Sequence, residues 1–196
     1  MLVRDTQLAL AANEGGSRWA AESQLNCTEY FKEPIACTEG ERREFAHLVR
    51  QGFEGSDEGL HGRIRDAEWL AFHYAVGDTL AAIAGLKTPD GRYRHDLYEK
   101  ADARVSPAEF KLELGWVFVV PVHRGHRIGE SLCRLLLARV PASSVFATTR
   151  PNNDSMIRIL LGLGFAPAGK PYPRRNEKLV LFLRSSPTFK APRPAT

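Results

Sequence analysis

Apolar positions in the first third of the chain recur at helical spacing. One face of a helix predicted after residue 38 carries Phe45, Leu48, Val49 and Phe53. Thr38 and Glu41 precede this face with the Thr-x-x-Glu spacing of a capping box, in which each side chain bonds the other residue's backbone N–H. A shorter helix is expected over 57–67. The region after residue 38 is therefore expected to be largely helical up to about residue 67.

The apolar pattern then becomes strand-like. Gly77 and Asp78 separate two β-like runs and predict a tight hairpin between them. The next strand is the most continuous apolar run in the chain, and Pro121 ends it because proline cannot donate to a sheet ladder. The predicted strands cover 69–76, 79–86, 111–120, 145–149 and 179–183.

Helical signals return between the later strands. Apolar residues at i, i+4, i+7 and i+8 predict a helix over 128–139. Another helix is expected over 156–163, with Asn153 or Asp154 as its N-cap and Gly164 as its stop. Residues 87–111 look irregular, with one or two helical turns near 96–100. This alternation predicts an α/β fold, a mixed sheet with helices on both faces.

Composition bounds the domain organisation. The 196 residues are 43% hydrophobic, which suits one globular core and excludes disorder for most of the chain. We expect a loose arm over residues 1–24, a single domain over 25–184 and a disordered tail over 185–196. No apolar run approaches the roughly 20 residues of a membrane span, and the N-terminus has no secretory pattern.

The cysteines point to a reducing compartment. Cys27, Cys37 and Cys133 are odd in number and have no CxxC spacing, so neither a disulfide framework nor a zinc cluster is expected. We expect a cytoplasmic protein without a metal. Cys133 lies on the apolar part of its helix and is expected in the core.

Positive charge is concentrated at one end of the chain. Residues 121–196 contain 13 of the 27 Lys and Arg residues but only 3 of the 23 Asp and Glu residues. Such a segment suits an anionic partner, either a phosphate-bearing cofactor or a nucleic acid. Residues 1–120 are acidic overall and would suit a cationic partner such as an amine.

The segment from Val119 to Ser131 carries the most specific chemistry. It combines the end of a strand, a turn rich in glycine and arginine, and a helix start. Unpaired N–H groups in the first helical turn favour phosphate binding, Gly125 and Gly129 allow close approach, and arginines add charge-assisted hydrogen bonds. The spacing fits neither a Walker loop nor a dinucleotide fingerprint. We interpret the segment as a diphosphate-binding turn.

This segment resembles the acetyl-CoA-binding motif of the GNAT superfamily of N-acetyltransferases, Gln/Arg-x-x-Gly-x-Gly/Ala. Arg124 and Gly129 match the motif, whereas Arg127 replaces its first glycine. A second similarity follows in the Asn-rich start of the helix after Asn153 and in Gly164-Phe165. The resemblance covers about residues 40–184. It implies a GNAT-type mixed, mostly antiparallel sheet with a splay between its two central strands.

The resemblance also implies which residues hold acetyl-CoA. The pantetheine arm would bond the backbone of Val117 and Val119, and Asn153 would contact the same arm. The diphosphate would lie on the turn and helix start, formed by Arg124, Gly125, His126, Arg127, Ile128, Gly129, Glu130 and Ser131.

Two residues are candidates for proton transfer. Glu113 stands six residues before Val119, where histone-acetylating relatives place a general base, and burial in an apolar strand favours the protonated form of a carboxylate. Period two predicts that Glu113, Val117 and Val119 share one face of the strand. The tyrosine that often serves as the acid is replaced by Leu160, and Tyr172, in a predicted loop, is the alternative candidate.

Three functions remain open from the sequence. The first is an N-acetyltransferase that transfers acetyl from acetyl-CoA to a primary amine of a small molecule or peptide by direct attack in a ternary complex. The second is a degenerate GNAT protein that senses acyl-CoA. The third, less favoured because no nucleic-acid motif is present, is a nucleic-acid-binding module that uses the basic C-terminal region. A membrane partner is not expected, and a homodimer is left open.

Overall fold

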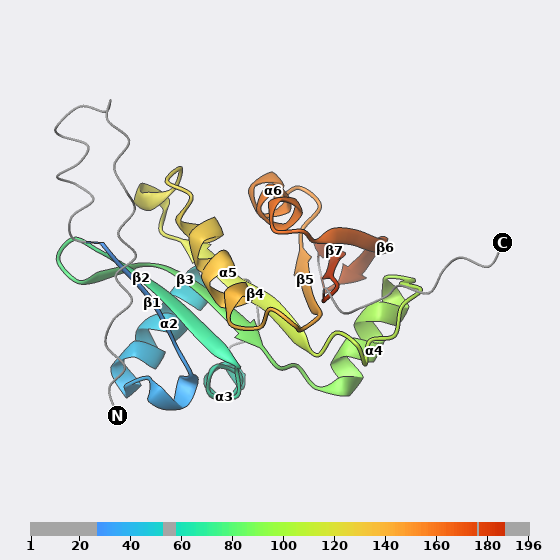
Figure 1. The fold of residues 1–196 in the computed structure, drawn as a ribbon, viewed down its shortest axis with the longest axis horizontal. Helices are drawn as coiled ribbons and strands as arrows, with labels where there is room; N and C mark the ends of the chain where they lie inside the picture. Colours follow the sequence, from blue (N-terminus) through green and yellow to red (C-terminus); the bar gives the residue numbers. More distant parts are fainter. Residues whose placement is uncertain (1–26, 53–57, 176, 187–196) are drawn as a thin grey trace.

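The computed structural model describes residues 27–52, 58–175 and 177–186 (Figure 1). Within these ranges one seven-stranded sheet has the order β1-β2-β3-β4-β5-β7-β6. Its strands are β1 Thr28–Lys32, β2 Trp69–Ala75, β3 Thr79–Lys87, β4 Leu112–Val119, β5 Val145–Thr149, β6 Ala166–Arg174 and β7 Glu177–Arg184. The helices are α2 Glu39–Gly52, α3 Leu60–Arg65, α4 Gly91–Lys100, α5 Ile128–Ala138 and α6 Asp154–Gly162, with single 3-10 turns η1 Pro34–Ala36 and η2 Pro121–His123.

The helices form two layers on opposite faces of the sheet. One apolar cluster joins α5 and α6 to the sheet through residues such as Leu132, Leu136 and Leu160. On the other face, α2 and α3 pack over β2–β4 and α4 packs over β5, β7 and β6, in two separate clusters. Only the β4–β5 pair is parallel among the described strand pairs. The predicted mixed, mostly antiparallel α/β fold is therefore confirmed.

Several local predictions are confirmed by hydrogen bonds. The Thr38 N–H donates to Glu41 Oε2 at 2.7 Å, and the Glu41 N–H donates to Thr38 Oγ1 at 3.1 Å, which completes the capping box. Asn153 is the N-cap of α6, because its Oδ1 accepts from the Met156 N–H at 3.1 Å. The hairpin between β2 and β3 turns at Gly77 and Asp78, which both have positive φ.

The sequence pattern missed two edge strands and most of one helix. β1 lies at one edge of the sheet, and β6 lies at the other edge, where prolines such as Pro171 and Pro173 are tolerated because an edge strand needs fewer ladder donors. Tyr172 therefore lies in a strand rather than in the predicted loop. The segment predicted to be irregular contains α4, whose N-cap Asp90 accepts from the Tyr93 N–H at 2.8 Å.

The prediction that Glu113 shares a face with Val117 and Val119 is wrong. The β3–β4 register shifts between Ile83 and Gly85, opposite Trp116, which has a φ of +52°. This irregularity inserts one residue, so the strict alternation of side chains is interrupted. Val117 and Val119 pack with Leu114 on the α5 face, whereas Trp116 packs on the α2 face. Glu113 also lies on the α2 face, opposite Lys87.

The ends of the predicted domain lie near the limits of the described residues. The predicted arm, residues 1–24, and residues 187–196 of the predicted tail lie outside them. Ser186, the second residue of that tail, is buried, and its N–H donates to Ser144 Oγ at 3.0 Å.

Candidate active site

A gap between the two central strands opens the candidate site. The parallel β4–β5 ladder pairs Leu112 to Leu114 with Val145 to Ala147 and then stops. Beyond it, the remainder of β4, from Gly115 to Val119, lines a cleft of about 1570 Å³, and Thr148 and Thr149 of β5 line the opposite side. This separation is the splay expected between the central strands. It leaves the backbone edge of β4 facing the cleft instead of a neighbouring strand.

The turn before α5 closes one end of the cleft. Gly125 has a φ of +86° and Arg127 a φ of +59°, in the left-handed region that costs a side-chain-bearing residue about 1 kcal/mol. Arg127 thus occupies a backbone position that suits the motif's usual glycine. A Cβ at Gly129 would lie 3.5 Å from both Val117 and Val119, so this glycine lets α5 approach β4 closely.

Most of the predicted cofactor residues line this cleft, and two do not. The lining residues include Val117, Val119, Arg124, Gly125, Arg127, Ile128, Gly129, Glu130 and Asn153. His126 is absent from the lining, so its predicted contact is not supported by the cleft geometry. The Ser131 hydroxyl is also outside it and donates to Glu29 Oε2 at 2.6 Å, because Ser131 faces β1.

The arginines of the turn already have partners within the fold. Arg124 Nε donates to the Val119 carbonyl at 2.9 Å, and its guanidinium lies 5.8 Å from the centre of the Phe118 ring. Arg127 and Arg134 both bond Glu130, at 2.9 Å in each ion pair. The hydrogen bond from Arg127, reinforced by that from Arg134, lowers the pKa of Glu130 despite some desolvation. Glu130 therefore orders two cations beside the helix start.

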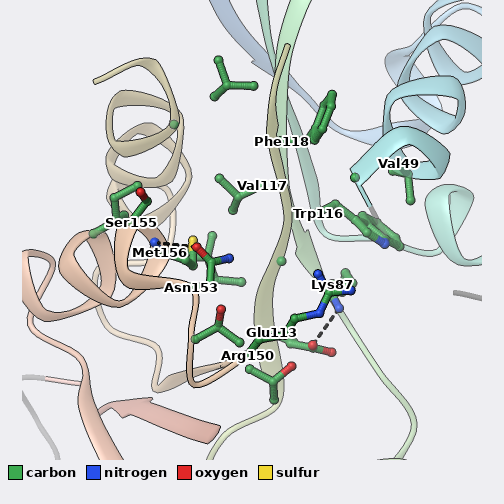
Figure 2. A pocket seen from close by; sticks show the side chains of 18 of the residues that line it. Val49, Lys87, Glu113, Trp116, Val117, Phe118, Arg150, Asn153, Ser155 and Met156 are labelled. Carbon is green, nitrogen blue, oxygen red and sulfur yellow. Dashed lines mark hydrogen bonds and ion pairs between the residues drawn. The ribbon is translucent and has the colours of Figure 1, made fainter. Parts of the chain in front are cut away.

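β4 divides the cleft into two halves with different side chains (Figure 2). On one side, Val117 points toward α6, where Asn153 and Met156 begin the helix. On the other side, Trp116 and Phe118 point toward Val49 of α2. We call these the α6 half and the α2 half. The bulge at Trp116 is what separates them.

A buried ion pair lies at the base of the α2 half. Lys87 Nζ is 2.7 Å from Glu113 Oε1, and the Glu113 side chain is only 5% exposed. The ammonium also lies 5.3 Å from the centre of the Trp116 ring. A Cβ at Gly115 would lie 2.8 Å from Lys87 Cε, so the lysine crosses β4 over a residue without a side chain. No sequence pattern marks Lys87 as a site residue, although it directly follows the predicted strand 79–86.

A second pair, Tyr93 and Arg174, borders the same half of the cleft. Arg174 Nη1 donates to the Tyr93 hydroxyl oxygen at 3.0 Å, and its guanidinium lies 5.1 Å from the ring centre. Tyr172, the predicted acid, is 2% exposed in the cluster beneath α4 and does not line the cleft. Burial is the main cause that raises the pKa of both tyrosines.

Much of the positive charge of residues 121–196 is matched inside the fold. Arg150 makes two hydrogen bonds of 2.6 Å to Glu177, in the bidentate geometry that guanidinium and carboxylate favour. Arg139 lies 4.8 Å from the centre of the Phe31 ring and 5.0 Å from that of Trp69. Arg150 and Arg139 are therefore held by contacts within the fold.

The family comparison decides the identity of this architecture. The model of the acetyltransferase (GNAT) family matches residues 29–165, which is more than half of the chain. The chain belongs to the GNAT acetyltransferase family. The predicted resemblance is therefore confirmed, and with it acetyl transfer as the general chemistry of this GNAT protein. A search of curated protein sequences finds no significant match.

Solved structures show the same fold at low sequence identity. An acyl-CoA N-acyltransferase from Pseudomonas aeruginosa is similar, with a TM-score of 0.62, 15% identity, and coverage of 82% of this chain and 100% of the other. Escherichia coli ElaA gives a TM-score of 0.60 at 15% identity, with the same coverage. Salmonella typhimurium yncA, solved with acetyl-CoA, gives 0.55 at 17% identity and covers 87% of this chain and 99% of its own.

The cleft of this GNAT protein fits acetyl-CoA in chemical terms. The unpaired edge of β4 suits an amide-bearing arm, and the helix start after Gly125 suits a diphosphate. In the part of the chain that the structure describes, no cluster of three or more His, Cys, Asp or Glu side chains is arranged to hold a metal ion. Among the same residues, none of the helices has the length and hydropathy needed to cross a membrane.

Proposed function

We propose that the protein is an N-acetyltransferase that moves an acetyl group from acetyl-CoA to a primary amine by direct attack in a ternary complex. The observation that carries this proposal is the early end of the β4–β5 ladder, with a buried carboxylate at the base of the cleft that results. A cleft divided by β4 provides separate approaches for two substrates. The α6 half suits the donor, and the α2 half suits the acceptor.

The donor is assigned to the α6 half because of its backbone and its helix start. Val117 and Val119 offer main-chain groups to the pantetheine arm, and the N–H groups after Gly125 face the diphosphate. Arg124, and Arg127 with Glu130, supply charged side chains beside those groups. Asn153 uses its Oδ1 to cap α6, so its amide nitrogen is the atom left for the donor.

The acceptor must lose a proton before it can attack the thioester carbon, and Glu113 is the proposed base. Its carboxylate lies on the α2 face, on the acceptor side of β4, and Lys87 fixes its position. As the new C–N bond forms, the C–S bond breaks and CoA leaves as a thiol. The backbone N–H near Val117 is the proposed donor to the developing oxyanion. Tyr172 remains a predicted acid, although its burial requires a proton path through Tyr93 or solvent.

Thiol release from acetyl-CoA tests this function. The full-length protein is incubated with acetyl-CoA and a panel of primary amines, and free CoA and acetylated amine are both measured. Amine-dependent release of CoA in equal amount to the acetylated product supports the proposal. The Glu113→Gln variant is expected to reduce turnover at least about 100-fold, as is typical when a general base is removed, while CoA affinity stays within about twofold.

Other outcomes favour the remaining functions. Stabilisation by CoA without acetyl transfer to any amine would favour the acyl-CoA sensor. Stabilisation by an oligonucleotide and not by CoA would favour the nucleic-acid-binding module instead. Equal turnover of Glu113→Gln and the native protein at every pH would remove Glu113 as the base.

A further inference from the structure

The α2 half of the cleft contains an arginine that is ordered but unmatched by a carboxylate. Arg174 ends β6, where its guanidinium stacks on the Tyr93 ring and donates to its hydroxyl. Among the described residues, no carboxylate lies within ion-pair distance of Arg174. Because the ring and the hydroxyl fix one side of the guanidinium, its other N–H groups are preorganised for an anion.

Most carboxylates that line the same half are already engaged. Glu113 pairs with Lys87 in this half, and Glu177, which lines the same cleft, pairs with Arg150. Asp90 accepts from the Tyr93 N–H as the N-cap of α4. These three carboxylates therefore have other partners in the fold, and none of them forms an ion pair with Arg174. The net charge of residues 1–120 suits a cationic amine, and Arg174 adds a group that suits an anion.

Arg174 shares its electrostatic surroundings with Glu113. Burial is the largest influence on the pKa of Tyr93 and raises it, and the charge of Glu113 raises it further. Burial lowers the pKa of Arg174, but Tyr93 and Glu113 more than offset this effect. Glu113, Tyr93 and Arg174 also line the same cleft. A ligand that reaches Glu113 with one group can meet Arg174 with another.

We propose that the acceptor is a free amino acid, whose carboxylate binds Arg174 while its amine faces Glu113. This inference rests on the proposed N-acetyltransferase function and narrows its substrate. The guanidinium of Arg174 can recognise the carboxylate of the amino acid through two parallel hydrogen bonds. The amine of the same amino acid must lose a proton to a base, the role proposed for Glu113. A peptide N-terminus fits less well, because its own α-carboxyl group is consumed in the peptide bond.

Matched substrate pairs test the proposal. The kcat/KM for acetylation is measured for each amino acid and for its carboxamide, which has the same shape and amine but no charge. The panel includes ω-amino acids of increasing length, so that the best separation of amine and carboxylate is measured rather than assumed. We expect the kcat/KM of each favoured acid to exceed that of its amide by at least about tenfold, because the amide cannot form the charge-assisted hydrogen bonds that a carboxylate forms with a guanidinium.

Variants of Arg174 test whether this residue causes the preference for the acid over its carboxamide. Arg174→Gln is expected to remove the preference for acid over amide, mainly through a higher KM for the acid, while the kcat/KM of the amide changes less than about threefold. Arg174→Lys retains the charge without the planar fork and should restore part of the preference. Lys178→Gln is the matched control, because Lys178 lies in the same hairpin beside Arg174 but does not line the cleft.

Binding measurements separate this proposal from the function on which it rests. If no amine is acetylated, the N-acetyltransferase function fails, and binding of the same acids and amides is then measured by calorimetry with CoA present. Preferential binding of acids that Arg174→Gln abolishes supports the anion site in either case. Equal use or binding of acids and amides, or a preference that survives Arg174→Gln, overturns it. Faster acetylation of peptide N-termini than of free amino acids also overturns it.

Discussion

Lys87 Nζ lies 2.7 Å from Glu113 Oε1, and the two residues face each other directly across β3 and β4. The pair joins β3, the second strand of the hairpin, to β4, the strand that lines the cleft. Its burial means that each charge depends on the other, because water replaces neither partner well. The same ion pair therefore contributes to fold stability and holds the proposed base, Glu113, in position.

Breaking the Lys87–Glu113 pair is expected to destabilise the fold. Lys87→Met leaves the Glu113 carboxylate buried without its partner and should lower the free energy of unfolding by about 3 kcal/mol. The double variant Lys87→Met/Glu113→Gln also removes the unpaired charge of Glu113 and should recover part of that loss. Denaturant unfolding of the two single variants and the double variant gives the coupling energy. Additive effects, with no coupling, would contradict a mutually dependent pair.

Removal of the Arg124 side chain is expected to weaken CoA binding. Arg124→Ala removes a guanidinium beside the proposed diphosphate position and should raise the Kd for CoA at least about tenfold, given about 1.5–3 kcal/mol for a charge-assisted hydrogen bond. Calorimetric titration measures the change. Arg134→Ala is the control, since Arg134 bonds Glu130 but does not line the cleft. Equal affinities for the Arg124 variant and the native protein would place the diphosphate elsewhere.

A single glycine is expected to hold α4 against the edge of the sheet. Gly169 has a φ of +69°, and a Cβ there would lie 2.0 Å from the Ala101 carbonyl oxygen, which accepts the Lys170 N–H at 2.7 Å. Gly169→Ala should therefore lower the free energy of unfolding by about 2–4 kcal/mol through strain and displaced backbone. Thermal unfolding measures this loss.

Gly62→Ala provides the matched comparison for that loss. Gly62 lies inside α3, and a Cβ there would meet nothing within 4 Å. Alanine at an open helical position should raise stability by about 0.5–1 kcal/mol. If both variants shift the unfolding temperature in the same direction, the close contact at Gly169 is not the cause.

Acid is expected to remove the contribution of Glu41 to stability. Burial raises the pKa of this carboxyl, but Lys32, the Thr38 N–H and Tyr30 together hold it below its usual value of 4.5. As the pH falls, the unfolded chain binds the proton first, so the contribution is complete above about pH 4.5 and disappears as the pH falls through the lowered folded pKa.

Glu41→Gln tests this dependence. The variant should be about 1–2 kcal/mol less stable than the native protein at pH 7, because it loses an ion pair and weakens the capping box. The difference should shrink below about pH 4, where the native carboxyl is also neutral. Glu39→Gln is the control, since the exposed Glu39–Arg42 pair should contribute little. A difference that is constant with pH would show that the charge of Glu41 is not responsible.

The separation of the two halves of the cleft depends on an irregularity that no periodic pattern contains. The sequence pattern predicts a regular strand over 111–120, and alternation then predicts one face for Glu113, Val117 and Val119. In the fold, Trp116 takes a positive φ, and its ring lies against Gly85, where a Cβ would be 2.6 Å from the ring. The ring is accommodated because the neighbouring strand has a glycine at that position. This information comes from β3 and is distant from β4 along the sequence.

Elements whose signals are local could be predicted from the amino-acid sequence alone. Helix caps at Thr38 and Asn153, the turn at Gly77, and the glycine-rich start of α5 depend on residues a few positions apart, so their chemistry can be read directly. Edge strand β6, with its prolines, and helix α4 lack such clear periodicity, because both are stabilised by packing in one apolar cluster.

The side chains that come together at the cleft could not be predicted without the three-dimensional fold. Lys87 reaches Glu113 because β3 and β4 pair in one register, and Arg174 reaches Tyr93 because β6 returns beside α4. Those contacts join residues 26 and 81 positions apart. Their geometry depends on strand register and sheet order, which the balance of packing over the whole core determines. The proposed donor-binding motif can therefore be recognised in the sequence, whereas the residues of the α2 half, the proposed acceptor side, are brought together only by the fold.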